Sequence, residues 1–345
     1  MKMNLLIASD DKEYSEHLSK TLLKSFSDVV VVSVCSSQKR LKEMLKEQKY
    51  DTALLEVSFC KDLGTNDIQL PFVLWTEDAK NHIPEDFVKI RKYQRISLMF
   101  EDVLENYAKV STNTRGIDVK KANITAVWSP SGGVGKTTVA LALAAFEASQ
   151  DKQAMYLNLE SFSSASGYFD TSGKSISTIF ELIETSGGNI NILMQSILRR
   201  DSASNISYFC CPDNFDDMNI LSTQHISSLI AACSELADEL IIDMSCLCDE
   251  RARYVFEVAD RIFLVSDNTN TAQVKLEHFM NRHNLFSQIK DKVYFVANKG
   301  AKLGKLSTKE MISLPLVESS DERKIYKVLS SFMKGGVVKE EQKHD

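Results

Sequence analysis

Residues 129–138 read Ser-Pro-Ser-Gly-Gly-Val-Gly-Lys-Thr-Thr, and this stretch decides the fold. An apolar run at 124–128 precedes it, and a second apolar run at 139–146 follows it. The pattern G-x-x-x-x-G-K-[ST] is met at Gly135, Lys136 and Thr137, but its first glycine, five residues before Gly135, is absent. A strand, a glycine-rich loop and a helix in this order are typical of a loop that binds phosphate groups.

The chemistry of phosphate binding accounts for each residue type in this loop. Backbone N–H groups must converge on phosphate oxygens, and side chains at the glycine positions would obstruct them. Lys136 is expected to reach the β- and γ-phosphates as a point charge, and the Thr137 hydroxyl to ligate Mg²⁺. The residues predicted to bind the nucleotide in this loop are Ser131, Gly132, Gly133, Val134, Gly135, Lys136, Thr137 and Thr138.

The sequence after this loop continues as an alternation of strands and helices. Apolar strands are predicted at 154–159, 207–210, 240–243, 261–265 and 292–297, after the first at 124–128. Helices are predicted at 137–149, 250–259 and 271–281. Continuous apolar strands alternating with helices indicate a doubly wound parallel sheet that is covered on both faces. We therefore predict an α/β domain at 123–336 and a charged tail at 337–345.

The first 110 residues repeat this alternation on a smaller scale. Short strands are predicted at 5–8, 29–34, 52–57, 72–76 and 89–93, and helices at 13–26, 38–48 and 100–108. This pattern predicts a second doubly wound α/β domain at 1–110. Residues 111–122 are polar at first and have no apolar period, so they are predicted to be the linker.

Composition excludes several other classes of protein. The 345-residue chain is 43% hydrophobic and 26% charged, which is an ordinary globular composition. Its net charge of −6 gives no strong sign of nucleic-acid binding. The seven cysteines have neither zinc nor disulfide-scaffold spacing, which suits a reducing compartment. The N-terminus does not resemble a signal peptide and the apolar runs are short, so we expect a cytoplasmic protein that meets membranes peripherally or through partners.

The phosphate loop resembles the deviant P-loop of the MinD/ParA class of ATPases, most of which read Lys-Gly-Gly-x-Gly-Lys-Thr-[Thr/Ser]. In that class the first lysine, the signature lysine, reaches across an ATP-sandwiched dimer to the partner's phosphates. Ser131 occupies its position in this chain. The resemblance implies that ATP, Mg²⁺ and a homodimer sandwiching ATP are retained. Fast hydrolysis is not expected, because a serine supplies no cation to the developing phosphoryl charge.

Other positions match this class in their order along the chain. Asn158 and Glu160 stand where the family has Asp-x-Asp, so Glu160 keeps a carboxylate on a longer arm. Asp243 ends a strand that resembles the Walker B strand and is expected to hold Mg²⁺ through water. The resemblance also implies that Asn298 hydrogen-bonds adenine and that Pro315 lies in the loop that packs on the base. Together with Lys136, we take Glu160 and Asp243 as the candidate catalytic residues.

The first domain resembles the receiver domain of response regulators. Asp10 and Asp11 match the acidic pair after the first strand, and Glu56 stands where receivers carry the phosphorylated aspartate. Thr76 and Lys92 match the residues that end strands four and five. Because Glu56 is one methylene longer than aspartate, we interpret the site as degenerate and not phosphorylated. Such a domain is most simply a docking or dimerisation surface.

A receiver-like domain followed by a MinD/ParA-like domain is an architecture similar to that of the TadZ/CpaE group of Flp/Tad-type pilus assembly proteins. The first hypothesis is an ATP-binding, dimerising localisation factor with slow or absent hydrolysis, which meets protein partners at a cell pole or in the pilus machinery. The alternative is a cycling MinD/ParA-type ATPase for cell-division, flagellar or chromosome and plasmid positioning. A third reading is a signalling module that has kept its receiver chemistry. The amphipathic segment 324–333 is interpreted as a core-packing helix, against the alternative of a membrane-binding helix.

Overall fold

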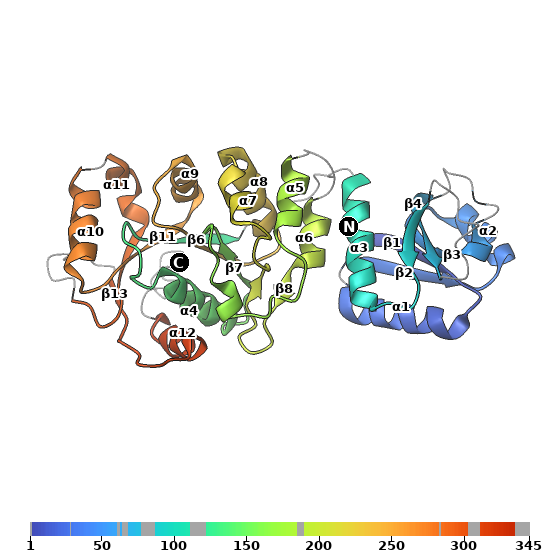
Figure 1. Cartoon of the computed structure of the whole chain (residues 1–345), viewed down its shortest axis with the longest axis horizontal. Helices are drawn as coiled ribbons and strands as arrows, with labels where there is room; N and C mark the ends of the chain where they lie inside the picture. Colours follow the sequence, from blue (N-terminus) through green and yellow to red (C-terminus); the bar gives the residue numbers. More distant parts are fainter. Residues whose placement is uncertain are drawn as a thin grey trace, which may run out of the picture. The chain divides into compact units, whose positions relative to one another are not determined.

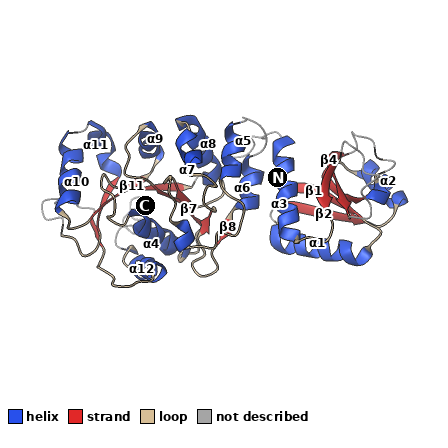
Figure 2. Cartoon of the chain, in the orientation of Figure 1, coloured by secondary structure: helices blue, strands red, loops and turns tan. Residues whose placement is uncertain are grey.

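A computed structural model describes residues 2–27, 29–60, 63, 68–76, 87–110, 122–184, 190–282, 284–302 and 311–334. The predicted linker, except Ala122, and the predicted tail lie outside these residues. The chain divides into two compact units, one built mainly from the first 114 residues and one from most of the remainder. Figure 1 shows the elements of both units, and Figure 2 separates helices from strands.

The first unit contains a five-stranded sheet in the order β2-β1-β3-β4-β5, with every neighbouring pair parallel. Its strands are β1 Met3–Ala8, β2 Val30–Cys35, β3 Tyr50–Glu56, β4 Ile68–Trp75 and β5 Val88–Arg91. Its main helices are α1 Lys12–Phe26, α2 Gln38–Glu47 and α3 Ile96–Val110. This is the flavodoxin-like strand order of doubly wound sheets. The α/β class that the sequence predicted for this part is confirmed.

Alternation along the strands fills both faces of this sheet. On β1, Leu5 and Ile7 join a cluster with α1 and α3, while Leu6 and Ala8 join a cluster with α2. Successive side chains of a strand point to opposite faces, so a strand buried on both sides must be apolar throughout. The helices therefore cover both faces, and the loops that follow β1, β3 and β5 meet at one edge.

One short helix from later in the chain belongs to the first unit. Residues 190–196, which form most of α6 (Ile190–Ile197), group with the first unit. Ile192 packs against the cluster that α1 and α3 form with the sheet. The first unit is thus built from two separate stretches of sequence, and the second stretch lies inside the domain predicted at 123–336.

The second unit is built on an eight-stranded sheet in the order β13-β12-β11-β6-β10-β7-β9-β8. All neighbours are parallel except β8 and β9, which pair antiparallel at one edge. The strands are β6 Asn123–Trp128, β7 Ala154–Asn158, β8 Arg199–Arg200, β9 Ser207–Tyr208, β10 Glu239–Asp243, β11 Arg261–Ser266, β12 Val293–Ala297 and β13 Met311–Ser313. The doubly wound parallel sheet predicted for this part is confirmed, with a short antiparallel edge added.

Helices lie on both sides of this sheet (Figure 1). They are α4 Lys136–Ala148, α5 Ser177–Glu184, α7 Phe215–Ile220, α8 Thr223–Ser234, α9 Glu250–Val258, α10 Asn270–Arg282, α11 Asn284–Ile289 and α12 Glu322–Ser330. Helix α4 is apolar on nearly every side because it lies between the sheet and α12. Tyr326 and Leu329 of α12 and the following Met333 are buried in the same cluster. The amphipathic segment at 324–333 therefore packs its apolar side into the core.

Four helices of the second unit, α5, α7, α8 and α11, are absent from the sequence prediction. They are short, and they contain many Ile, Thr, Ser and Asn residues, which have low helix propensity. The local sign that could have revealed two of them is their capping boxes, at Asn214 and Ser222. Among the described residues, no helix combines the length and the apolar character needed to cross a bilayer.

Candidate functional site

The phosphate loop joins the central strand β6 to helix α4, at the carboxyl end of the sheet. Gly133 and Gly135 have φ angles of 76° and 90°, a region that side chains rarely adopt. A Cβ atom at Gly135 would also clash with the side-chain amide of Asn298. Gly135 is therefore required both by its backbone conformation and by the close approach of a neighbouring loop.

Helix α4 begins at Lys136 and carries no side-chain cap at its N-terminus. Its first N–H groups are thus free to bind an anion, and the helix dipole favours negative charge there. The Lys136 side chain is only 7% exposed, and its Nζ lies 3.6 Å from Glu160 Oε1. Glu160 is therefore the counter-ion of Lys136 in this structure. Lys136 and Glu160, which the sequence singled out separately, lie together.

Asp243 ends β10, which lies between β6 and β7 in the sheet. The residue is fully buried, and its Oδ2 accepts a hydrogen bond of 2.8 Å from the Tyr156 hydroxyl. Burial and the nearby Glu160 charge raise the pKa of Asp243 to about 7, against the opposing effects of Thr137, Tyr156 and Lys136. Its other oxygen, Oδ1, is buried and has no hydrogen-bond partner among the described residues. An unpaired buried carboxylate oxygen is costly unless a ligand completes it.

A chain of hydrogen bonds links Asp243 to the loop after β7. Asn158 Nδ2 donates to the Tyr156 hydroxyl at 3.0 Å, and the Glu160 N–H donates to Asn158 Oδ1 at 2.7 Å. Asn158 thus acts as a neutral link between Asp243 and Glu160. A carboxylate at this position could still accept from the Glu160 N–H, but it could not donate to the Tyr156 hydroxyl and would add a negative charge next to Asp243 and Glu160. Tyr156 was not recognised from the sequence, because a buried tyrosine in a strand looks like an ordinary core residue.

The arrangement fits a nucleotide phosphate chain with a magnesium ion. The glycine cradle and the start of α4 suit phosphate oxygens, and Lys136 suits the β- and γ-phosphates. The Thr137 hydroxyl would ligate Mg²⁺, and the unpaired Asp243 Oδ1 would hold one of its waters. No group of three or more His, Cys, Asp or Glu in the described part of the chain is arranged to hold a metal ion by itself. A magnesium ion bound mainly by phosphate, hydroxyl and water needs no such group.

Ser131, at the position of the signature lysine, is 5% exposed. Its backbone N–H donates to the Ser129 hydroxyl at 3.1 Å. The Ser129 hydroxyl therefore fixes the backbone of the loop at Ser131. The Ser131 side chain is buried and uncharged, so it cannot supply a cation to a phosphate group.

The loop after β12 contacts the phosphate loop directly. Asn298 is 3% exposed and its Nδ2 donates to the Val134 carbonyl at 2.9 Å. Lys299 Nζ donates to the Gly133 carbonyl at 2.7 Å. Pro315 is half-buried after Leu314, whose N–H donates to the Ala297 carbonyl. The structure thus places Asn298 and Pro315 at neighbouring strand ends, and it brings Lys299, to which the sequence analysis gave no role, onto the phosphate loop.

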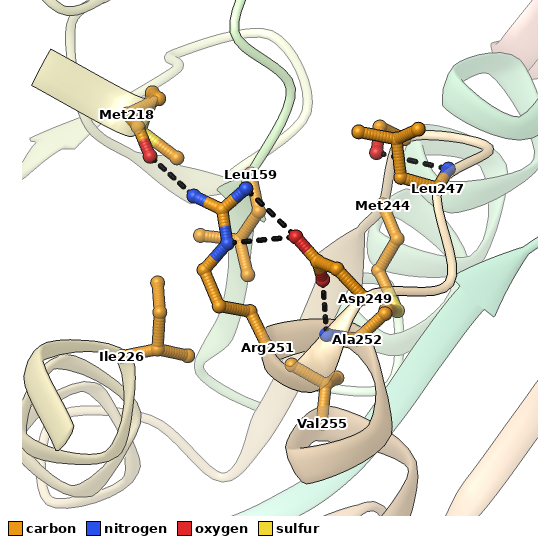
Figure 3. A pocket seen from close by; sticks show the side chains of 10 residues that line it. Leu159, Met218, Ile226, Met244, Leu247, Asp249, Arg251, Ala252 and Val255 are labelled. Carbon is orange, nitrogen blue, oxygen red and sulfur yellow. Dashed lines mark hydrogen bonds and ion pairs between the residues drawn. The ribbon is translucent and has the colours of Figure 1, made fainter. Parts of the chain in front are cut away.

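A small pocket lies at the ends of β7 and β10 (Figure 3). Its lining includes Leu159 and Met244, the neighbours of Glu160 and Asp243 in sequence. Arg251 crosses it, donating to Asp249 and to the Met218 carbonyl. Its volume of about 40 Å³ is far too small for a nucleotide, so the pocket is not the candidate nucleotide site.

In the first unit, three of the predicted receiver positions come together. Lys92 Nζ lies 2.5 Å from Glu56 Oε1 and 3.3 Å from Asp11 Oδ2. The cation also lies over the rings of Tyr14 and Tyr93, at 4.7 and 4.8 Å from their centroids. Desolvation acts to lower the pKa of Lys92, but its hydrogen bonds to these acids and Tyr93 outweigh that effect and raise the pKa.

Glu56 is held by several donors besides Lys92. The Ser9 hydroxyl donates to its Oε1 at 2.7 Å, and the Asp10 N–H to its Oε2 at 3.4 Å. Burial acts to raise the pKa of Glu56, but hydrogen bonds with Asp10, Lys92 and Ser9 outweigh that effect and lower it. The pKa of the Asp10 carboxyl is raised, chiefly by its hydrogen bond with Glu56. Thr76 follows β4 and is half-buried, and in the part of the chain that the structure describes it makes no hydrogen bond to Glu56 or Lys92.

No protein-family model matches the chain, and no curated protein matches it in sequence. Solved structures do match. A ParA family ATPase from Chlorobium tepidum TLS aligns with a TM-score of 0.50 at 15% identity, over 63% of this chain and 92% of that chain. The septum site-determining protein MinD from Pyrococcus horikoshii OT3, complexed with Mg-ADP, aligns with a TM-score of 0.44 at 13% identity, over 61% of this chain and 94% of that chain. At such identities the ParA similarity shows the fold alone: a large part of this chain has the parallel α/β fold of a ParA family ATPase.

Proposed function

We propose that this protein is an ATP-binding factor that dimerises around its nucleotide and positions other cell components, with slow or absent hydrolysis. The observation that carries the proposal is the contrast within one loop. Lys136, Thr137 and Asp243 would bind phosphate and Mg²⁺, whereas the position that would supply a cation to the partner is a buried serine, Ser131. Binding without the catalytic cation makes ATP closer to a structural ligand, which stabilises the state that holds it.

We further propose that the positioned apparatus is a Flp/Tad-type pilus and that the first unit is its docking part. Support comes from the joined architecture, a flavodoxin-like sheet of order 2-1-3-4-5 and a ParA-like sheet in one chain. The closed Lys92–Glu56 pair supports a receiver-like site that no longer switches. The protein would act in the cytoplasm, at a cell pole or at the inner face of the membrane, through protein partners.

A cycling MinD/ParA-type ATPase is the second candidate function. The unpaired Asp243 Oδ1 favours it, because a site that keeps a free carboxylate oxygen for magnesium retains part of the hydrolytic machinery. Under this alternative another group would have to replace the signature lysine, and a partner protein would stimulate turnover.

Steady-state ATP turnover at high protein concentration separates the two. We expect the wild type to bind Mg-ATP but turn over almost none, and Lys136→Ala to lose binding. Ser131→Lys is expected to gain rate by roughly tenfold or more, because it restores a cation at the transferred phosphate. Ser131→Ala is the matched control for disturbing this buried position, and melting temperatures report whether each variant folds. Wild-type turnover that Lys136→Ala abolishes would favour the cycling ATPase instead.

A further inference from the structure

Two consecutive residues after β12, Asn298 and Lys299, contact two consecutive carbonyls of the phosphate loop. Asn298 Nδ2 donates to the Val134 carbonyl at 2.9 Å, and Lys299 Nζ donates to the Gly133 carbonyl at 2.7 Å. These contacts join residues 164 and 166 positions apart in sequence. Both come from side chains, while the atoms they hold belong to the backbone of the loop.

The geometry of the peptide bond gives these contacts a consequence. In a planar trans peptide, the carbonyl of one residue and the N–H of the next point in opposite directions. Fixing the Gly133 carbonyl therefore fixes the direction of the Val134 N–H, and fixing the Val134 carbonyl fixes that of the Gly135 N–H. In the part of the chain that the structure describes, neither N–H donates to any acceptor. Two free donors are thus turned away from the Asn298–Lys299 side of the loop.

Lys299 is itself held in place. Its Nζ lies 3.2 Å from Asp267 Oδ2, and Asp267 is in turn fixed by the Thr269 N–H and hydroxyl at 3.0 and 2.6 Å. The Lys299 backbone lies in the left-handed region, with φ of 55°. A residue other than glycine in this region is uncommon and persists where its surroundings fix it. The Lys299 ammonium is therefore held in position to bind the Gly133 carbonyl, although its side chain is 43% exposed.

We propose that Lys299 is a positioning residue for nucleotide binding: acting with Asn298, it orients the phosphate loop so that the Val134 and Gly135 N–H groups face the phosphates. This inference rests on the proposed nucleotide-binding function and extends it to a residue outside the motif. Preorganised N–H donors bind a charged ligand without a prior rearrangement of the loop. The avoided cost of that rearrangement increases the affinity. The Lys299 ammonium touches the loop and not the ligand.

The test measures the affinity for Mg-ADP by calorimetry, because ADP avoids turnover. Lys299→Met keeps the aliphatic stem and removes the donor, and we expect its dissociation constant to rise roughly 10- to 30-fold. Lys299→Arg keeps a donor and is expected to stay within about threefold of the wild type. Lys302→Met makes the same change of charge at an exposed lysine of the same loop and is expected to bind as the wild type does. Melting temperatures of the nucleotide-free variants report whether each variant still folds.

Salt separates positioning from a through-space attraction between Lys299 and the phosphates. A screened charge effect shrinks as the Debye length falls from ~10 Å at 0.1 M salt to ~3 Å at 1 M. We expect the ratio of the Lys299→Met and wild-type dissociation constants to persist at 1 M NaCl. The inference is overturned if Lys299→Met binds as the wild type does, or if the ratio disappears at high salt. A wild type that binds no Mg-ADP would instead refute the proposed function, and the inference with it.

Discussion

Two lysines, one in each unit, pair with a glutamate at the carboxyl end of a parallel sheet, and the two sites differ in what they leave unpaired. Lys92 lies 2.5 Å from Glu56, with Asp11 and two aromatic rings completing its surroundings. Lys136 lies 3.6 Å from Glu160, beside a glycine cradle and a buried Asp243 oxygen without a partner. Similar strand-end chemistry thus gives a closed ion pair in one unit and an open site in the other.

The difference shows how a site that is open to a ligand can be distinguished from one whose charged groups pair with one another. Polar groups buried without partners cost free energy, and such groups are retained where a ligand repays the cost. In the described part of the first unit, Lys92, Glu56 and Asp11 contact one another, so their charges already have partners. The second unit keeps Asp243 unsatisfied and its loop donors free. Three measurements test this difference between the two sites.

The largest effect is expected from Lys92→Met in the first unit. The change removes the cation that pairs with Glu56, and breaking a buried pair costs about 3 to 5 kcal/mol. The chain has two tryptophans, Trp75 in the first unit and Trp128 in the second. Denaturation followed by Trp75 fluorescence in a Trp128→Phe background reports on the first unit.

The control for this variant is Lys89→Met, at an exposed lysine of β5. It is expected to change stability by less than about 0.5 kcal/mol. Mg-ADP affinity should be the same in both variants, because we expect the ion pairs of Lys92 with Glu56 and Asp11 to stabilise the first unit only. A fall in nucleotide affinity with Lys92→Met would contradict the division of roles between the two sites.

Asp243→Asn should stabilise the magnesium- and nucleotide-free protein at neutral and alkaline pH. The folded pKa of Asp243, about 7, lies above the usual value of 3.8, so the folded state binds more protons between these values. Stability therefore falls as pH rises from about 4 to about 7 and is level above that. The penalty is at most about 4 kcal/mol, at 1.36 kcal/mol per pKa unit.

The measurement is chemical denaturation followed by Trp128 fluorescence in a Trp75→Phe background, between pH 4 and 9 in the presence of a chelator. The variant should match the wild type near pH 4, since both side chains are then neutral, and exceed it above pH 7. Asp260→Asn is a control at an exposed aspartate of the same unit, whose carboxylate accepts a hydrogen bond from the Ile124 N–H. If the free energy of unfolding changes with pH in the same way in Asp243→Asn and the wild type, the pKa of Asp243 is not raised in the folded state.

The smallest effect is expected from acetyl phosphate on the first unit. Incubation with labelled acetyl phosphate and Mg²⁺ should leave the wild type unlabelled, because Glu56 is too long to place its oxygen as an aspartate would and is held by Lys92. Glu56→Asp restores the shorter carboxylate and is expected to take up a small amount of label. Mass spectrometry of the intact chain measures both. A labelled wild type would revive the reading of this unit as a working receiver.

The sequence alone determined the main strands, the phosphate loop and the fold class, because these depend on local rules. Apolar runs of strand length, glycines at a turn and a helix start after Gly135 are all readable within a few residues. Only weak local patterns were missed, such as the short helices α5, α7, α8 and α11.

Only the tertiary structure decided which side chains meet. Tyr156 binds Asp243 because β7 and β10 are neighbours in the sheet, and Asn298 reaches Val134 because β12 and β6 both end at the same edge, with β11 between them. The same sheet order brings Lys299 to Gly133. Spacing along the chain carries no information about these pairs, since they join residues far apart in sequence. The order of strands in the folded sheet is set by the packing of the whole domain, and with it the difference between a satisfied pair and an open site.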